Sequence, residues 1–345
     1  MIKKLSGLFI LLIILASCKT NLVYISVLVP APITVPGIAK TAGIINRSIP
    51  PATNAQSNVH HVLSGQTIAM IKEGSAESIR GFKDALIENE RFKEVKSLDN
   101  VKMNGQGAGV FPSPLSWDEV AAIGRANNVE IIFALELFDT ELKVNPNSAP
   151  DLSSPSSTVN SILTTEVNFT TIVKTGWRIY DPRLKKIHDE STFNQKFSFT
   201  GTAITSAQTA EVLIGRKETI KRTANALGRD YATQILPYWV RVNRDYYVKG
   251  NSNFEKATRM ARAGNWDKAG EVWNMETTNH KDKIAGRACY NMAIINEING
   301  DLDSAIRWAQ KAYEEYNNKL ALHYIQILKD RKQENQRLES QQEQP

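Results

Sequence analysis

The sequence contains few cysteines and no block of like charge. Its 345 residues include only Cys18 and Cys289, which are too few for an exported domain held together by several disulfides. The net charge is +6, but the basic residues are spread out and form no stripe typical of a nucleic-acid-binding protein. With 42% hydrophobic and 23% charged residues the composition is that of a globular protein, and the length suffices for about two domains.

Catalytic and metal-binding motifs are also missing. Neither the Gly-x-Ser-x-Gly elbow nor a His-Glu-x-x-His helix occurs. No Cys, Asp or Glu stands near His60 and His61 at a metal-ligand spacing, and His188 and Asp189 should point to opposite faces of a strand. Cys289 falls on a core position of a helix. We therefore expect no catalysis, no metal and no cofactor.

The first residues have the features of a secretory leader. Lys3 and Lys4 precede the uncharged run 5–17, which is too short for a transmembrane helix of about 20 residues. A basic start, a short apolar run and small residues at its end are typical of a signal peptide. We therefore expect residues 1–17 to be removed.

The residues at the end of this run, Leu15-Ala16-Ser17-Cys18, resemble the lipobox of bacterial lipoproteins. The resemblance implies cleavage between Ser17 and Cys18 and a diacylglycerol on the Cys18 thiol, with residues 18–29 as anchor and tether. Acyl chains such as palmitate would hold the chain on a membrane, because each buried CH₂ contributes about 0.8 kcal/mol. A plain signal peptide with an incidental cysteine is the alternative.

The residues after Cys18 bear on the location of the chain. No acid follows in Lys19-Thr20-Asn21, which by the sorting rule of enteric lipoproteins favours the outer membrane. We expect a lipid-anchored protein of the cell envelope, on the outer membrane and facing the periplasm.

Residues 30–250 are expected to form an α+β domain, with a mixed sheet, an antiparallel meander and flanking helices. The expected order is strand, helix, strand, helix, three strands and helix, and a flexible loop at 145–160 joins two of the meander strands. Ser116 and Glu119 make a capping box, Ser75 is a candidate N-cap, and Glu136 falls on the polar side of a strand over 129–144. The element order resembles the periplasmic α/β domain of TolB-type proteins and curli-secretion lipoproteins, which assigns no functional residue.

Two C-terminal segments repeat each other 36 residues apart, with Gly264 matching Gly300 and Ala269 matching Ala305. This resembles the tetratricopeptide repeat, whose period is 34 residues. The resemblance implies a short all-α domain of helical hairpins over 251–331, including a capping helix, before a flexible tail at 332–345. Glu276 stands where a small residue is usual, so its helix is expected to end early. The residues expected to pack the hairpins are Ala257, Gly264, Ala269, Trp273, Ala293, Gly300, Ala305 and Ala312.

Tetratricopeptide arrays usually bind peptides or proteins along the concave face of their first helices. In this chain the resemblance places the following candidates for partner binding on that face: Phe254, Thr258, Arg262, Arg287, Tyr290 and Ile294. The alternative is that these residues pack the repeats against the first domain.

The leader, the phrase Asn46-Arg47-Ser48 and the C-terminal repeats together resemble an uncharacterised family of Gram-negative envelope lipoproteins. The leading hypothesis is a non-enzymatic periplasmic adaptor that binds envelope proteins or peptides through its repeats, the membrane through its lipid, and no nucleic acid. The alternatives are an envelope hydrolase with a cleft between its domains, and an oligomeric subunit of an envelope assembly or secretion complex.

Overall fold

The computed structural model describes residues 20–49, 68–101, 103, 111–144, 166–202 and 206–342. These residues divide into two compact units. The sheet unit contains the described residues between 31 and 237, together with 340–342, and the helical unit contains residues 20–30 and 238–339. The leader, Cys18 and the loop expected at 145–160 lie outside the described residues.

The described part of the sheet unit contains a five-stranded mixed sheet in the order β3-β2-β4-β5-β6. Strand β2 (Thr41–Asn46) is parallel to β3 (Glu94–Ser97) and to β4 (Ile131–Val144). Strands β5 (Glu166–Asp181) and β6 (Lys186–Thr202) continue the sheet in antiparallel order. The expected mixed sheet with an antiparallel meander is therefore confirmed.

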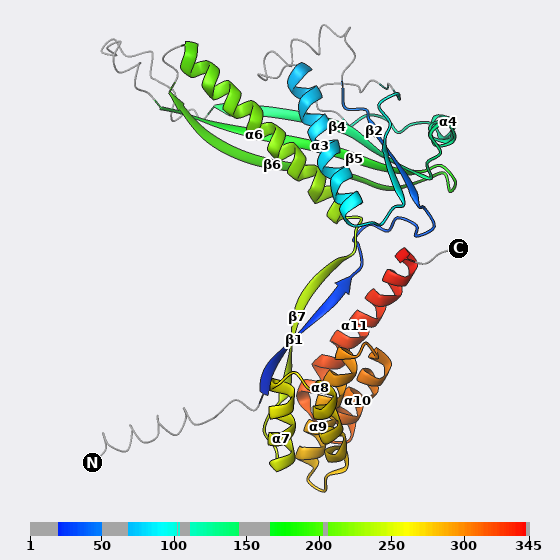
Figure 1. The fold of residues 1–345 in the computed structure, drawn as a ribbon, viewed down its shortest axis with the longest axis vertical. Coiled ribbons are helices and arrows are strands. Elements are labelled where there is room, and N and C mark those ends of the chain that lie inside the picture. Colours follow the sequence, from blue (N-terminus) through cyan, green and yellow to red (C-terminus); the bar gives the residue numbers. More distant parts are fainter. Residues whose placement is uncertain are drawn as a thin grey trace, which may run out of the picture. The chain divides into compact units, whose positions relative to one another are not determined.

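Alternation along β4 distributes its side chains to the two sheet faces. Phe133 packs with Phe82 of α3 (Ile68–Glu88) and Tyr231 of α6 (Ser206–Thr233), and Figure 1 shows these two helices side by side across the sheet. Ile132 and its neighbours pack with the apolar side of α4 (Trp117–Asn127) on the other face. The centre of the sheet is thus covered on both faces, in agreement with the burial of nearly all of β2 and of the first part of β4, whereas β6 at the edge has many exposed residues.

Two N-terminal helix caps were expected in the sheet unit. At α4 both arms of the capping box are present, since Ser116 accepts from the backbone of Glu119 while the Glu119 carboxylate accepts from Ser116. The N-cap expected at Ser75 is wrong, because α3 begins at Ile68 and Ser75 is buried inside it. Its hydroxyl donates to the Lys72 carbonyl and accepts from Asn46, so tertiary contacts satisfy a residue that otherwise favours a helix start.

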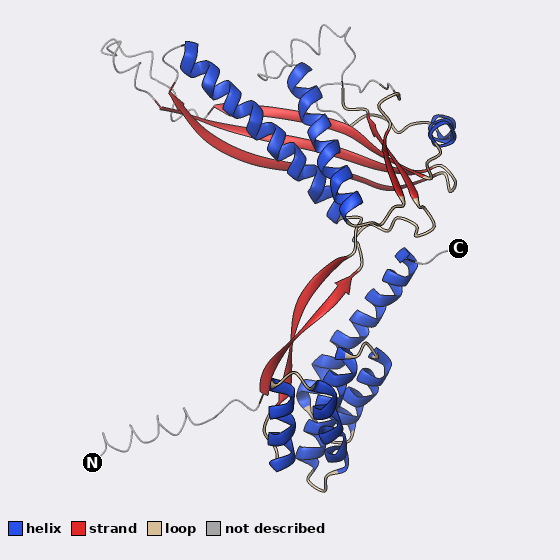
Figure 2. Cartoon of the chain, viewed as in Figure 1, coloured by secondary structure: helices blue, strands red, loops and turns tan. Residues whose placement is uncertain are grey.

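The helical unit begins with a two-stranded antiparallel ribbon of β1 (Thr20–Val29) and β7 (Tyr238–Tyr247). Its helices are α7 (Ser252–Arg262), α8 (Trp266–Met275), α9 (Asp282–Ile298), α10 (Leu302–Glu314) and α11 (Lys319–Gln342), and a 3₁₀ turn, η2 (Glu276–Thr278), follows α8. Figure 2 distinguishes the ribbon from the helices by colour. The expected α+β part followed by an all-helical part is confirmed.

The expected domain boundaries differ from the structure in three places. Residues 20–29 form β1 rather than a tether, because the alternating Val23, Ile25 and Val27 find partners in β7. Residues 238–250 belong with the helices rather than with the α/β domain. The tail expected from 332 onward is helical as far as Gln342.

The helical hairpins are closed at two glycines. Gly264 and Gly300 join α7 to α8 and α9 to α10, with φ of 83° and 82°. Glycine has no Cβ and adopts this left-handed conformation without strain. The other expected packing residues are all completely or almost completely buried: Ala257, Ala269, Trp273, Ala293, Ala305 and Ala312.

Glu276 ends α8 early, as expected, and has a role that the sequence does not indicate. It lies buried in the turn η2, where its carboxylate accepts hydrogen bonds from the amides of Asn251, Asn253 and Asn279. Burial by itself would raise the pKa of Glu276, but these three hydrogen bonds lower it below the ordinary value. The residue thereby ties the start of α7 to the end of α8.

A second buried carboxylate joins the ribbon to the helices. Glu297 of α9 is completely buried and accepts from Arg244 of β7 at 2.9 Å and from Arg331 of α11 at 2.7 Å. The Tyr324 hydroxyl of α11 donates to the same carboxylate. Burial would raise the pKa of Glu297, but the hydrogen bonds and the positive charges lower it. One carboxylate thus connects three elements.

Replacement of Glu297 tests this connection. Glu297→Gln should lower the free energy of unfolding by about 3 kcal/mol at pH 7, because two buried arginines lose their counter-charge. Because the pKa of Glu297 is lowered in the folded protein, its charged form stabilises the fold at pH values above about 4.3, the ordinary pKa of a glutamate in an unfolded chain. This contribution is lost as the pH falls through the pKa of the folded state. The difference from the wild type should therefore shrink below about pH 4.

Amide hydrogen exchange in α9 and α11, measured between neutral and acidic pH, reports this difference. Glu271→Gln, at an exposed position of α8, is the matched control. At each pH its exchange rates should equal those of the wild type. A pH-independent effect of Glu297→Gln would contradict the ionic role.

Close contact between α3 and α6 generates a second prediction. A Cβ atom added at Gly228 of α6 would overlap the Ser78 carbonyl and lie 2.9 Å from the Phe82 nitrogen, whereas one added at Gly215 of the same helix meets nothing within 4 Å. Gly228→Ala should destabilise the sheet unit by about 2 kcal/mol through forced separation of the helices. Gly215→Ala should instead stabilise it by about 0.5–1 kcal/mol through helix propensity. Urea unfolding of the two variants measures both effects, and equal shifts would show that the helices can separate at no cost.

Candidate functional site in the helical unit

The six residues expected to receive a partner do not share one exposed surface. Phe254 and Ile294 are completely buried, and Tyr290 and Thr258 are almost completely buried. Arg287 is half-buried, and Arg262 is exposed. Four of the six are thus unable to contact a partner unless whatever covers them moves away.

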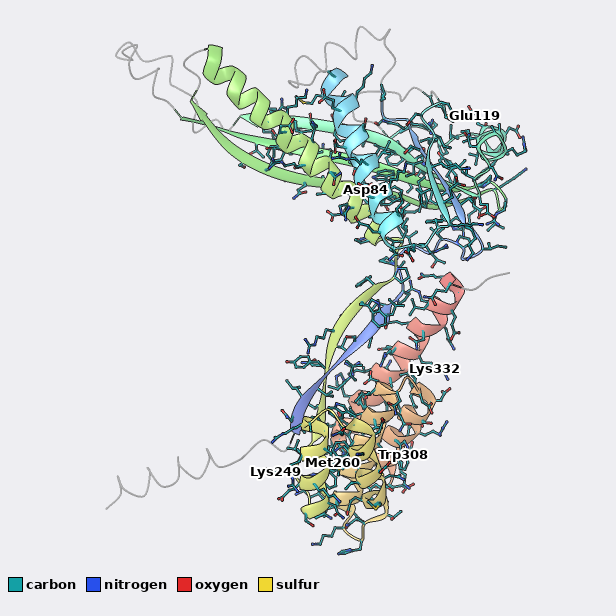
Figure 3. The ribbon with its side chains drawn as sticks, viewed as in Figure 1. Asp84, Glu119, Lys249, Met260, Trp308 and Lys332 are labelled. Carbon is teal, nitrogen blue, oxygen red and sulfur yellow. The ribbon has the colours of Figure 1, made fainter. Side chains whose placement is uncertain are left out.

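The residues at and after the end of β7 account for part of this cover. The Asn291 side chain accepts from the Tyr247 backbone N–H and donates to the Tyr247 carbonyl, both at 2.7 Å. Thr258 donates to the Val248 carbonyl at 3.2 Å, and Arg287 donates to the Lys249 carbonyl at 2.6 Å. Lys249 is labelled in Figure 3.

These contacts are made to main-chain atoms of residues 247–250, which begin with the last residue of β7 and which we call the docked segment. At its end, Gly250 lies so close to the Phe254 ring that an added Cβ would be 2.6 Å from ring atoms. The helical surface where a partner was expected therefore binds a stretch of its own chain, through backbone groups and through the Tyr247 ring, which contacts Tyr290.

An open groove of about 640 Å³ lies beside the docked segment. The end of β7, the first half of α9 and the turn between α10 and α11 form it. Its lining residues are Tyr247, Asp282, Lys283, Gly286, Arg287, Tyr316, Asn317, Asn318 and Lys319. Only Arg287 belongs to the six expected partner-binding residues; the others were not singled out because loop and helix-start residues carry no periodic signal.

Hydrogen bonds hold the floor of this groove in place. The Tyr247 hydroxyl and Asn318 are 3.2 Å apart, and Asn318 donates to the Gly286 carbonyl at 3.2 Å. The Tyr316 hydroxyl donates to the Thr277 carbonyl, which fixes the opposite wall. Burial raises the pKa of Tyr247, although Asn318 and Arg287 act in the other direction, so its hydroxyl stays protonated at neutral pH.

The groove is mainly basic and partly aromatic. Lys283, Arg287 and Lys319 contribute positive charge against the single acid Asp282. The Arg287 guanidinium lies 5.1 Å above the Tyr247 ring, in a cation–π contact that keeps it facing the groove. Such a lining suits an anionic or acidic ligand with an apolar part. No histidine, cysteine or serine is among the lining residues.

The residues weighed as catalytic candidates have structural roles in the described part of the chain. His188 lies 3.4 Å from Asp181, which also accepts two backbone N–H groups of the β5–β6 turn. Burial lowers the pKa of His188, so the ring is neutral at neutral pH. Asp189 points elsewhere and accepts from the Tyr231 hydroxyl, as the alternation along a strand predicts. Burial raises the pKa of Cys289 to about 11, which keeps its thiol protonated.

A buried ionic cluster follows the end of β2. Arg47 binds both carboxylate oxygens of Glu136, at 2.8 and 2.6 Å, and the Tyr180 hydroxyl donates to Glu136 at 2.7 Å. Arg178 adds a hydrogen bond to the Pro112 carbonyl at 2.9 Å. The cluster thereby fixes the segment before α4, which gives Arg47 of the phrase at 46–48 a structural role.

Glu136 was expected on the polar side of its strand, and this is wrong. The pairing of β4 with β5 shifts register between Leu135 and Leu137, so Glu136 sits at an irregularity and is buried. The positive charges of Arg178 in β5 and of Arg47, which follows β2, compensate the buried Glu136 carboxylate. The sequence does not indicate that these two arginines lie close to Glu136.

Two further features are absent from the described residues. No group of three or more His, Cys, Asp or Glu side chains that could hold a metal ion occurs in them. None of their helices combines the length and the apolar character needed to cross a bilayer. Cys18 and Ser17, the expected lipid and cleavage positions, fall outside these residues, as do His60 and His61.

Several solved structures are similar to this chain. A minor lipoprotein from Acinetobacter baumannii is 12% identical, with a TM-score of 0.26, over 59% of this chain and 98% of its own. The PelC dodecamer from Paraburkholderia phytofirmans is 7% identical, with a TM-score of 0.24, over 63% of this chain and 99% of its own. At these TM-scores the likeness carries no statement about this chain. No curated protein matches it.

Two family models match the sequence. Residues 255–330, within the helical unit, match the domain of unknown function DUF6340. Residues 39–247, more than half of the chain, match the domain of unknown function DUF8603, and the chain therefore belongs to that family.

Proposed function

We propose that this chain is a non-catalytic, lipid-anchored adaptor of the bacterial cell envelope, on the outer membrane and facing the periplasm. The groove of its helical unit would bind an extended, acidic segment of a partner protein. The anchor is supported by the lipobox-like residues 15–18 and by their position, two residues before β1 begins. The absence of an acid after Cys18 supports the outer membrane.

The docked segment is the observation that carries the binding proposal. Asn291, Thr258 and Arg287 hold three successive residues through their backbone, so this helical surface is already built to bind extended chain. Recognition of backbone atoms gives affinity without demanding a particular sequence, and nearby side chains then supply selectivity. The open groove continues from the docked segment at Tyr247, where both share a wall.

The lining supports an acidic partner over a basic or neutral one. Lys283 and Lys319 are exposed at the groove, where a partner carboxylate would approach them with little desolvation. Tyr316 and Tyr247 offer ring surface for an apolar side chain. The resemblance of the helical hairpins to tetratricopeptide repeats, which bind peptides on this side, is consistent with the same reading.

The anchor is tested in cells that produce the chain. Wild-type protein should sediment with the outer-membrane fraction and release an acylated N-terminal peptide on digestion, detectable by mass spectrometry. Cys18→Ala should abolish acylation and move the protein to the soluble fraction of the envelope. An unmodified Cys18 thiol on the mature protein, or an intact leader, would contradict the proposed lipid anchor.

The groove is tested with a photo-reactive amino acid in the same cells. Placed at Lys319, in the groove lining, it should give a crosslinked product of defined mass. Placed at Lys268, an exposed position of α8 that does not line the groove, it should not. The substitutions Lys283→Glu and Lys319→Glu together should reduce the yield at least about tenfold when the probe is moved to Asn317, since two favourable charge pairs become repulsive. Equal crosslinking from both probe positions would refute a specific groove partner.

A further inference from the structure

The two faces of the β1–β7 ribbon differ in what covers them. One face carries Val23, Ile25 and Val27, which are all buried. Residues with the opposite orientation form the outward face, which we define as Leu22, Tyr24, Ser26 and Leu28 of β1 together with their register partners Asp245, Asn243, Arg241 and Trp239 of β7. Within the helical unit, no helix covers the large side chains of this face.

The outward face exposes unusually large apolar side chains. Trp239 is 70% exposed, Tyr24 is 56% exposed and Leu22 is 45% exposed. The register places Trp239 beside Leu28 at one end of the face and Tyr24 two residues from Leu22 at the other. Two exposed apolar groups thus lie at the two ends of one narrow face, with Arg241 and Asn243 between them and Asp245 beside Leu22. Exposure of large apolar side chains on one face is typical of an interaction surface.

The chemistry of this face is that of a membrane interface. Trp and Tyr rings concentrate at the level of lipid headgroups, where one part of the ring is apolar and another is polar. The Arg241 guanidinium lies 4.6 Å above the Tyr24 ring, in the middle of the face. An arginine held on an aromatic ring among apolar neighbours can bind a lipid phosphate while its methylene groups stay in apolar contact.

The position of Cys18 supplies the second, independent argument. Thr20, the first residue of β1, stands two positions after Cys18, and an extended chain covers about 3.3–3.6 Å per residue. Lipid on Cys18 would hold Thr20 within about 7 Å of the lipidated residue. Leu22 and Tyr24 follow within a further 7 and 13 Å or so along the strand. A lipid on Cys18 would therefore keep the Leu22 end of the ribbon close to the membrane surface.

We propose that the outward face of the β1–β7 ribbon lies on the phospholipid surface and forms a second membrane contact beside the lipid anchor. The proposal rests on the proposed anchor for the location of the ribbon. It adds that the helical unit is held against the bilayer rather than at the end of a tether. The strand that leads into the docked segment then has one face in lipid and one face on the helices.

A lipid surface fits this face better than a second copy of the chain. Arg241 stands near its centre, so two copies docked symmetrically about that centre would bring two guanidinium groups together. Phosphate groups of an anionic bilayer complement the same charge. Self-association through the face is therefore the competing outcome that the experiment must be able to detect.

The experiment uses the mature chain carrying Cys18→Ser, so that no acyl chain contributes. Flotation with vesicles of phosphatidylethanolamine and phosphatidylglycerol measures the partition coefficient. The wild-type face should bind, and the double substitution Tyr24→Ser, Trp239→Ser should weaken partitioning by about tenfold, equivalent to about 1.4 kcal/mol. Arg241→Glu should weaken binding to these anionic vesicles more than binding to phosphatidylcholine vesicles, whose headgroups carry a phosphate but no net charge.

Tyr238→Ser is the matched control. Tyr238 is 47% exposed and adjoins Trp239 in sequence, but its orientation is that of the other ribbon face. It should change partitioning less than about twofold if the outward face alone touches lipid. Both variants replace exposed side chains, and their circular dichroism and thermal unfolding should match those of the unsubstituted chain.

Three results would overturn the proposal. One is the failure of the Cys18→Ser chain to bind either vesicle type. Another is equal loss of binding on Tyr238→Ser. The third is a dimer in sedimentation analysis that the double substitution dissolves, which would assign the face to a second copy. Because the acyl chain is absent throughout, all three are independent of whether Cys18 is lipidated in cells.

Discussion

A single buried carboxylate determines how the ribbon and the helices of one unit come together. Glu297 of α9 accepts hydrogen bonds from Arg244 of β7 and from Arg331 and Tyr324 of α11. Burial of this carboxylate costs free energy, and the partners that compensate the cost also connect α9 to β7 and α11. With Arg244 fixed, the alternation of β7 decides which side chains meet the helices and which face outward. The docked segment, the groove beside it and the exposed aromatic face all follow from that one alignment.

The helical surface is thereby used twice. Its central part binds Tyr247–Gly250 through the backbone, and its margin remains open as a basic groove. Four of the six residues that resemblance to peptide-binding repeats singles out are buried, and the docked segment contacts three of them, Phe254, Thr258 and Tyr290. A repeat surface filled by its own chain can contact a partner only along what the filling segment leaves uncovered.

Local patterns in the sequence carried much of the fold. The capping box at Ser116 depends on neighbours within a few residues, and the sequence predicts it directly. The turns at Gly264 and Gly300 and the end of α8 before Glu276 follow from the resemblance to tetratricopeptide repeats. The pairing of β1 with β7 joins two segments that are far apart in the sequence, and the proline-rich segment around β1 does not indicate which strand pairs with it. In the sequence, Asn291, Glu297 and Glu136 cannot be distinguished from exposed polar residues, because their partners in the fold are distant along the chain. Among the residues that line the groove, the resemblance to tetratricopeptide repeats singled out only Arg287. The others lie at a turn, at the end of a strand and in the first turns of a helix.

The sealed thiol of Cys289 has a consequence for maturation. In the folded protein this sulfur is buried and its pKa is raised to about 11, so oxidants and disulfide exchangers meet almost no thiolate there. Before α9 has packed, the same sulfur would be accessible and would ionise at its ordinary value. In an oxidising compartment the hairpins would therefore have to close faster than the thiol is captured, and a chain that folded late would accumulate as mixed disulfides or crosslinked pairs.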